Sequence, residues 1–167
     1  QQIQEKFILE QDENDFISAI LQSGYTFSQR GEEKDIYFSD INGDFISNRV
    51  CLRTRIHEDK PIQVLYKDDP YKDKKYVITE GVDYEISSKY ETNFINFLEK
   101  LNYHKYCTVN KHRAEYTQYD GDIVYKIFID KFDGKCFIEF MVMTKSNWSR
   151  EDLIEQLDKR LIEFKSF

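Results

Sequence analysis

The sequence VCLRTRIHEDKPIQVLYK occupies residues 50–67, and its pattern decides how the rest of the chain is interpreted. Two apolar runs flank a short polar segment, which is typical of a β-hairpin. Side chains two residues apart share one face of a strand, so Arg53 and Arg55 point the same way, and Lys67 ends the second run. Two cations on one strand face are unfavourable in a core unless an anion meets them. The hairpin therefore predicts a basic face for which the remaining chain is the scaffold.

Composition limits the possible classes of protein. The chain has 167 residues, enough for one domain with a substantial core, and we expect a single domain spanning residues 1–167. A hydrophobic fraction of 40% with 16% aromatic residues argues against disorder and favours a sheet-rich interior. The formal net charge of −7 disfavours a nucleic-acid partner, so any cationic site must be local.

The cysteine and histidine residues give no sign of a zinc site. Cys51, Cys107 and Cys136 are scattered and lack a CxxC spacing, which favours reduced cysteines in a cytosolic protein. No apolar run approaches the roughly 18 residues of a membrane span, and no signal-peptide pattern opens the chain. We therefore expect a cytoplasmic protein without a membrane partner.

Period-two and helical patterns alternate along the chain. The predicted strands are residues 2–9, 35–38, 49–56, 62–67, 76–86, 106–118, 123–132 and 135–144, and the predicted helices are residues 11–23, 87–101 and 149–164. The candidate N-caps are Asp12 or Asn14 for the first helix, Ser87 or Ser88 for the second and Ser149 for the third, and Ser149 is followed by Asp152 at capping-box spacing. Long strands joined largely by hairpins predict an α+β protein: a closed antiparallel β-barrel of about eight strands with three flanking helices.

Charged side chains recur within the predicted strands. Pairs two residues apart are Arg53/Arg55, Asp83/Glu85 and Lys111/Arg113, and single charges are Lys6, Lys67, Asp130 and Glu139. One interpretation is the solvated face of an ordinary antiparallel sheet. The other is the lumen of a closed sheet, which is favoured because cations and carboxylates gather on different strands. Buried cations would then call for a polyanion together with a divalent metal.

Short motifs follow one another in a fixed order along these strands. They are DIYF at residues 35–38, LRTR at 52–55, YK at 66–67, DYE at 83–85, KHR at 111–113, ID at 129–130 and FIEFM at 137–141. The ordered set resembles the CYTH superfamily, the triphosphate tunnel metalloenzymes, from residue 2 to about residue 141. That group includes class IV adenylyl cyclases, thiamine triphosphatases and inorganic tripolyphosphatases.

The resemblance implies a tunnel that binds a nucleoside triphosphate, thiamine triphosphate or tripolyphosphate and hydrolyses or cyclises it. It implies that the triphosphate is bound by Lys6, Arg53, Arg55, Lys67, Lys111 and Arg113. It also implies Mg²⁺ or Mn²⁺ held by Asp83, Glu85, Asp130 and Glu139, and it assigns catalysis to Lys6, Glu85 and Glu139. Tyr37 is either a residue at the tunnel entrance or an ordinary packed strand aromatic.

Three positions depart from the family pattern. Gln2 and Gln4 stand where the opening Glu-x-Glu-x-Lys motif has glutamates, and Met141 stands where the closing pair has its second glutamate. An amide keeps an oxygen ligand but loses the charge, and a thioether is not a ligand that magnesium prefers. The sequence therefore lacks three carboxylates of the family pattern, whereas the cations that the resemblance assigns to phosphate binding remain.

Two functions stay open at this point. The chain is either a metal-dependent triphosphatase or cyclase, as the resemblance implies, or a catalytically degenerate nucleotide- or polyphosphate-binding protein acting as a sensor, sponge or regulatory module. The enzymatic family slightly favours the first, and the missing carboxylates favour the second. A third interpretation is an interaction module without a working site. No motif selects adenine, thiamine or bare polyphosphate, and none indicates an oligomeric state.

Overall fold

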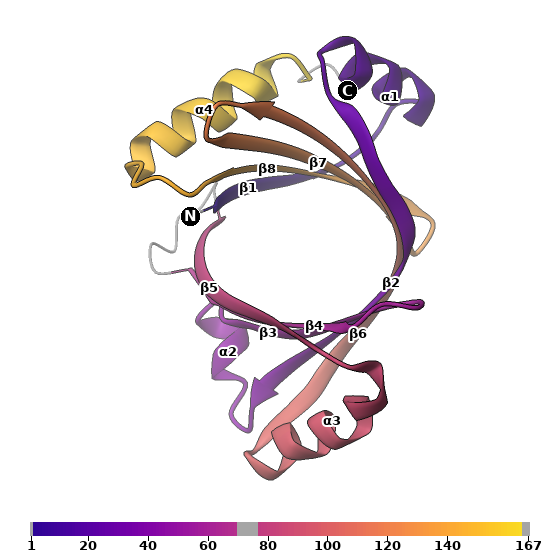
Figure 1. The fold of residues 1–167 in the computed structure, drawn as a ribbon, viewed down its shortest axis with the longest axis vertical. Helices are drawn as coiled ribbons and strands as arrows, with labels where there is room; N and C mark the ends of the chain where they lie inside the picture. The colour runs from indigo at the N-terminus through magenta and orange to yellow at the C-terminus, as the bar shows by residue number, and fades with distance from the viewer. Residues whose placement is uncertain (1, 70–76, 165–167) are drawn as a thin grey trace. The chain divides into compact units, whose positions relative to one another are not determined.

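The computed structural model describes residues 2–69 and 77–164 (Figure 1). Its strands are β1 Gln2–Ile8, β2 Thr26–Asp40, β3 Cys51–His57, β4 Ile62–Asp68, β5 Val77–Ile86, β6 Tyr103–Asp120, β7 Ile123–Phe132 and β8 Lys135–Thr144. Its helices are α1 Glu13–Gln22, α2 Asp44–Ser47, α3 Glu91–Lys100 and α4 Arg150–Ile162, and a short 3₁₀ helix at Ser88–Tyr90 precedes α3.

The chain forms two compact units. The described residues of Gln1–Gly31, Asp73–Ile78 and His112–Phe167 make the first unit, and those of Glu32–Lys72 and Thr79–Lys111 make the second. The boundaries fall inside β2 and β6, so these two long strands contribute to both units.

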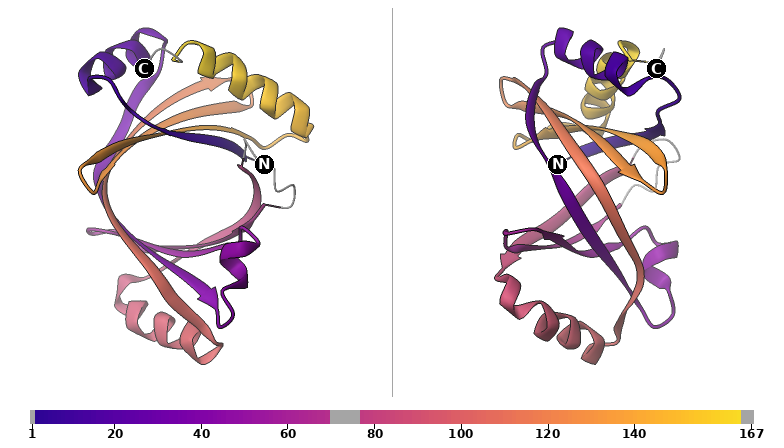
Figure 2. Two further views of the ribbon diagram at one scale, coloured as in Figure 1. Left: turned by 180° about the vertical axis from the view of Figure 1, so that it is seen from behind. Right: turned by 90° about the vertical axis from the view of Figure 1, so that its right-hand side faces the viewer.

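The first unit is an antiparallel sheet with two helices on one face. The C-terminal half of β6 pairs with β7, β7 with β8, and β8 with β1. Ile138, Phe140 and Val142 of β8 are buried in the core that also contains residues of α1 and α4. Figure 2 shows these two helices over the same face of the sheet. Because side chains alternate along a strand, the odd-numbered residues of β8, among them Glu139 and Met141, lie on the opposite, polar face.

The sequence signals for α1 and α4 are confirmed. The Asp12 carboxylate accepts hydrogen bonds from the backbone N–H groups of Asn14 and Asp15, at 2.8 and 3.3 Å. The Ser149 hydroxyl accepts one from the Asp152 N–H at 3.1 Å, and the Asp152 carboxylate accepts one from the Ser149 N–H at 3.2 Å. These bonds satisfy N–H groups that have no partner inside the helix, which fixes where each helix begins.

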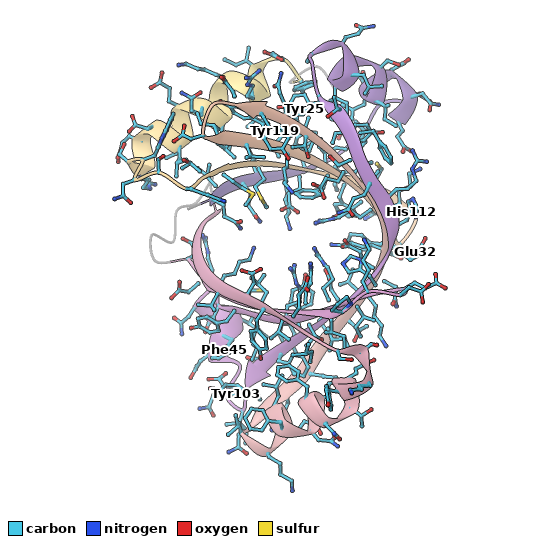
Figure 3. The ribbon with its side chains drawn as sticks, in the orientation of Figure 1. Tyr25, Glu32, Phe45, Tyr103, His112 and Tyr119 are labelled. Atoms are coloured by element: carbon cyan, nitrogen blue, oxygen red, sulfur yellow. The ribbon has the colours of Figure 1, made fainter. Side chains whose placement is uncertain are left out.

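The second unit is also an antiparallel sheet with an apolar and a polar face. Its strand order is β5-β4-β3-β2-β6, with β2 and β6 contributing their residues in this unit. Ile36, Phe38 and Leu98 form its core, and the Phe45 and Tyr103 rings pack at 5.4 Å between centroids (Figure 3). Alternation again places Arg53 and Arg55 opposite this apolar face, as the sequence predicts.

The predicted fold class is confirmed, with corrections in detail. The protein is α+β, and the part of the chain that the structure describes contains eight strands paired antiparallel. Strand β2 begins at Thr26 rather than residue 35, because its polar first half pairs inside the sheet without an apolar alternation to signal it. The four-residue helix α2 was not predicted, and the predicted loop at residues 68–75 lies largely outside the described residues.

Candidate anion-binding site

A buried carboxylate gathers three cations in the second unit. Asp35 is fully buried, and Arg55 forms a two-bond fork to it, with Nε 2.7 Å from Oδ1 and Nη2 2.8 Å from Oδ2. Lys111 Nζ lies 3.2 Å from Asp35 Oδ2, and Arg53 Nη1 lies 3.9 Å from the same oxygen. Glu33 Oε2 is 3.1 Å from Arg55 Nε. We call Glu33, Asp35, Arg53, Arg55 and Lys111 the arginine cluster.

Strand register creates this cluster. Asp35 of β2 stands directly opposite Arg55 of β3, and Tyr37 stands opposite Arg53. Side chains directly opposite one another in an antiparallel pair are close enough to interact. The two-residue spacing of Arg53 and Arg55 on β3 is thus matched by a carboxylate and a phenol, Asp35 and Tyr37, at the same spacing on β2.

The electrostatics of the cluster keep Asp35 ionised. Burial opposes the charged form, but the hydrogen bonds and charge of Arg55 outweigh it, with help from Arg53 and Lys111, and hold the pKa of Asp35 well below its usual value. His57 Nε2 lies 3.8 Å from Glu33 Oε1, yet burial lowers the pKa of His57. His57 is therefore neutral at pH 7, and the cluster itself carries three positive and two negative charges.

Arg53 differs from Arg55 in how its donors are used. Its side chain is 15% exposed, its contact with Asp35 is longer than a hydrogen bond, and its Nε is buried without a hydrogen-bond partner. The neighbouring Tyr37 has its pKa raised by burial, against the charge and hydrogen bond of Arg53, and its ring lies 6.2 Å from that of Tyr106. Tyr37 is thus a packed strand aromatic that also contacts Arg53.

A second set of charges lies on the polar face of the first unit. Arg113 forms a fork to Asp130, with both N–O distances 2.6 Å, and its Nη2 is 3.2 Å from Glu139 Oε2. Lys6 Nζ is 3.2 Å from that same oxygen, and Lys6 and Glu139 stand opposite each other in β1 and β8. The Arg113 guanidinium also lies 4.2 Å from the centre of the Phe128 ring. We call Lys6, Arg113, Asp130 and Glu139 the Glu139 cluster.

A third polar group, which the sequence did not reveal, continues along this face. Glu115 accepts hydrogen bonds from Lys126 at 2.7 Å, Gln29 at 3.0 Å and Thr117 at 3.3 Å. Burial disfavours its charge, but the bonds from Lys126 and Gln29 prevail and lower the pKa of Glu115. The period-two spacing of Arg113, Glu115 and Thr117 was the available signal.

The residues beside the Glu139 cluster bear on metal binding. Gln4 stands opposite Met141 and Gln2 opposite Met143, so neutral side chains occupy this part of β1 and β8. Across residues 2–69 and 77–164, no group of three or more His, Cys, Asp or Glu side chains is placed to hold a metal ion. Because Asp130 and Glu139 are bonded to Arg113, and Glu139 also to Lys6, the donor set of the first unit does not fit a magnesium site.

The other predicted ligands lie in the second unit. Asp83 and Glu85 are exposed residues of β5 and stand opposite Leu65 and Gln63 of β4. Lys67 stands opposite Gly81, where an added Cβ would lie 2.5 Å from the Tyr66 carbonyl oxygen, so β5 approaches β4 too closely there for a side chain. Asp83 and Glu85 thus belong to one unit and Asp130 and Glu139 to the other.

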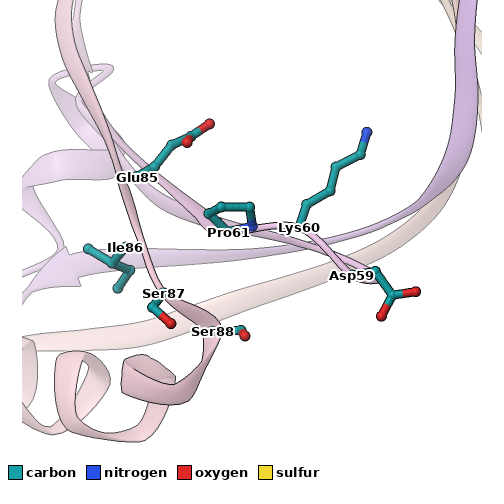
Figure 4. A pocket seen from close by; sticks show the side chains of 7 residues that line it. All are labelled: Asp59, Lys60, Pro61, Glu85, Ile86, Ser87 and Ser88. Carbon is teal, nitrogen blue, oxygen red and sulfur yellow. The ribbon is translucent and has the colours of Figure 1, made fainter.

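Glu85 also borders a surface pocket of about 550 Å³ in the second unit (Figure 4). The pocket is lined by Asp59, Lys60, Pro61, Glu85, Ile86, Ser87 and Ser88. Its charged side chains are two carboxylates and one lysine, which does not make it a basic site for an anion.

The structure therefore groups seven of the predicted residues. Arg53, Arg55 and Lys111 gather around Asp35, and Lys6, Arg113, Asp130 and Glu139 form the second cluster. Lys67, Asp83 and Glu85 lie on the paired strands β4 and β5 of the second unit. Sequence reasoning missed Glu33 and Asp35, although Asp35 opens the DIYF motif. Only the pairing of β2 with β3 indicates its partner.

Comparison with known families identifies the class of protein. The CYTH domain model matches residues 3–165, so the chain belongs to the CYTH family. Members of this family bind triphosphates, include adenylyl cyclase-like proteins and triphosphatases, and as enzymes are generally dependent on a divalent metal. No curated protein sequence matches.

Solved structures share the fold at low sequence identity. An adenylate cyclase-like protein from Vibrio parahaemolyticus is 17% identical with a TM-score of 0.76, covering 98% of this chain and 88% of its own. A protein from Pyrococcus horikoshii is 17% identical with a TM-score of 0.74, covering 98% and 89%. An adenylyl cyclase-like protein from Hippeastrum, described as having a dominant triphosphatase activity, is 13% identical with a TM-score of 0.67, covering 98% and 87%.

No helix within the described part of the chain combines the length and the apolar character that crossing a membrane requires.

Proposed function

We propose that this chain binds a triphosphate-containing anion and that the arginine cluster contacts its phosphates. The observation that carries the proposal is Arg53, a mostly buried guanidinium whose Nε has no hydrogen-bond partner and whose nearest carboxylate oxygen is 3.9 Å away. An unpaired buried donor costs about 1–3 kcal/mol. A phosphate oxygen that engages Arg53 would recover that cost without taking a bond from Asp35.

Arg55 supports the same function in a different way. Its fork to Asp35 fixes the plane of the guanidinium, so Asp35 acts as a positioning residue. With three cations and two carboxylates, the cluster attracts an anion although the whole chain carries −7. The candidate ligands are a nucleoside triphosphate, thiamine triphosphate and tripolyphosphate.

The test is isothermal titration of the purified chain with tripolyphosphate, ATP and thiamine triphosphate. Losing one charge-assisted contact costs about 1.5–3 kcal/mol, so Arg53→Ala should weaken binding about tenfold or more. Lys100→Ala, which removes one positive charge from the exposed end of α3, is the matched control and should leave the affinity within about twofold. A wild-type chain that binds none of the three ligands contradicts the proposal.

Phosphoryl transfer, by hydrolysis or cyclisation, is the second candidate. The observation that favours it is the Lys6–Glu139 pair, in which an exposed ammonium and a buried carboxylate are 3.2 Å apart. Glu139 would accept a proton from the attacking water or ribose hydroxyl, and Lys6 would neutralise charge on the phosphate. Glu85 is the third residue to which the family resemblance assigns catalysis, and we include it in this proposal.

Turnover decides between binding alone and catalysis. If the pair is catalytic, phosphate or cyclic nucleotide is released by the wild-type chain, and Glu139→Gln lowers the rate about a hundredfold or more. Glu85→Gln tests the third role in the same assay. Triphosphate binding with no turnover in Mg²⁺ or Mn²⁺ would leave the chain as a binding protein and rule out the catalytic assignment.

A further inference from the structure

We infer that the triphosphate this chain binds is the metal-free anion, with its charge met by lysine and arginine side chains rather than by a divalent ion. The inference rests on the proposed triphosphate binding and specifies the chemical form of the ligand. It departs from the CYTH enzymes in general, which depend on a divalent metal.

The first argument is the chemistry of the side chains on β1 and β8. Gln4 is 5% exposed and stands opposite Met141, an amide facing a thioether in the place where two carboxylates would make a divalent site. The Gln4 Oε1 atom is buried and has no hydrogen-bond partner. Magnesium is held by carboxylate and water oxygens in near-octahedral geometry, and a thioether sulfur is a soft ligand that it does not select.

The second argument is that the remaining carboxylates, Asp130 and Glu139, already bind cationic side chains. Both oxygens of Asp130 accept hydrogen bonds from Arg113 at 2.6 Å, and Glu139 Oε2 lies 3.2 Å from both Arg113 and Lys6. Two cations and two carboxylates balance within the Glu139 cluster. A divalent ion placed on these carboxylates would lie beside Arg113 and Lys6 and would have to displace charge-assisted bonds.

The third argument concerns the anion itself. A carboxylate repels a phosphate oxygen unless a metal lies between them, whereas a glutamine amide offers N–H donors to it. Gln2 and Gln4 therefore remove a repulsion and leave neutral groups next to Lys6. The same replacements that weaken a metal site make the face more compatible with a bare polyphosphate chain.

The experiment measures the sign of the magnesium effect on tripolyphosphate binding to the wild-type chain. Titrations are run at matched ionic strength, with EDTA and with excess Mg²⁺. Because Mg²⁺ chelates tripolyphosphate and so depletes the metal-free anion, a chain that takes only that anion shows an apparent Kd that is raised in excess Mg²⁺. An apparent Kd that Mg²⁺ leaves unchanged or lowers overturns the inference but leaves triphosphate binding intact. No binding in either condition removes the proposed function, and this inference with it.

A variant tests directly whether the side chains at positions 4 and 141 decide metal binding. Mn²⁺ alone is the probe, and its electron paramagnetic resonance signal is the readout. The wild-type chain should leave millimolar Mn²⁺ unbound, and Gln4→Glu with Met141→Glu should bind it, because the two new carboxylates stand opposite one another next to Glu139. The control, Gln22→Glu with Asn96→Glu, adds the same charge on exposed helix positions and should bind none. Mn²⁺ bound by the wild-type chain and lost in Glu139→Gln would also overturn the inference.

Discussion

Asp35 shows how a single buried carboxylate can organise a basic site. It is fully buried, it orients Arg55 through two hydrogen bonds, and it lies near Arg53 and Lys111. Three cations this close would repel one another without it. At the scale of residues, the buried carboxylates Asp35, Asp130 and Glu139 bind arginine and lysine side chains. The resemblance to the CYTH superfamily implies instead that Asp130 and Glu139 hold a metal.

The low pKa of Asp35 predicts an acid-sensitive structure. A carboxyl group with a lower pKa in the folded than in the unfolded state stabilises the fold fully above its unfolded pKa of about 4, and that contribution is lost as the pH falls toward the folded value. Asp35→Asn should lower the free energy of unfolding at pH 7 by about 3–5 kcal/mol and flatten its decline below pH 4. Urea denaturation between pH 2.5 and 7 measures both effects.

Asp133→Asn is the matched control for that experiment. Asp133 is exposed in the turn between β7 and β8 at φ 53°, a conformation that asparagine tolerates. It should change stability by less than about 0.5 kcal/mol at any pH. If Asp35→Asn behaved in the same way, the proposed role of Asp35 as the anchor of the cations would be wrong.

Whole elements were predictable to different degrees. Strands β7 and β8 have the predicted bounds, because apolar alternation and the turns at Gly121 and Gly134, both at positive φ, mark their ends. The first half of β2 was missed because its residues are polar, and α2 because four residues carry no period. The 3₁₀ helix before α3 shows that Ser87, a predicted cap, forms no side-chain cap bond.

The two serines that precede helices give a matched pair of stability measurements. Ser149→Ala removes the capping box of α4 and should lower the free energy of unfolding by about 1 kcal/mol. Ser87→Ala removes no cap bond and should change it by less than about 0.5 kcal/mol. Chemical denaturation compares them, and equal effects would contradict the assignment of the α4 cap.

At the scale of the molecule, an acidic chain carries local basic clusters. The net charge is −7, yet the arginine cluster alone brings three cations together. Such a site is expected to act only at short range, because the Debye length is about 8 Å at physiological ionic strength. The CYTH domain model matches residues 3–165, which fits the expectation of one domain. Because the chain also divides into two compact units, the single domain stays a prediction.

Binding should also be visible in global stability. At free tripolyphosphate about 100 times its Kd, the folded chain should gain about 2.7 kcal/mol, which a calorimetric melting scan reports as a raised Tm. Arg53→Ala should show a smaller shift at the same ligand concentration, and Lys100→Ala the wild-type shift. A Tm that rises equally in Arg53→Ala would place the phosphates elsewhere on the molecule.

The sequence by itself determined which residues share a face. Alternation put Arg53 with Arg55 and Lys111 with Arg113, and it showed the neutral residues Gln4 and Met141 among the charges. Only the tertiary structure decided the partners: Asp35 opposite Arg55, Asp130 opposite Arg113, and Gln4 opposite Met141. The physical reason is that side-chain direction follows from the local backbone, whereas register depends on hydrogen bonds between strands that can be far apart in the chain.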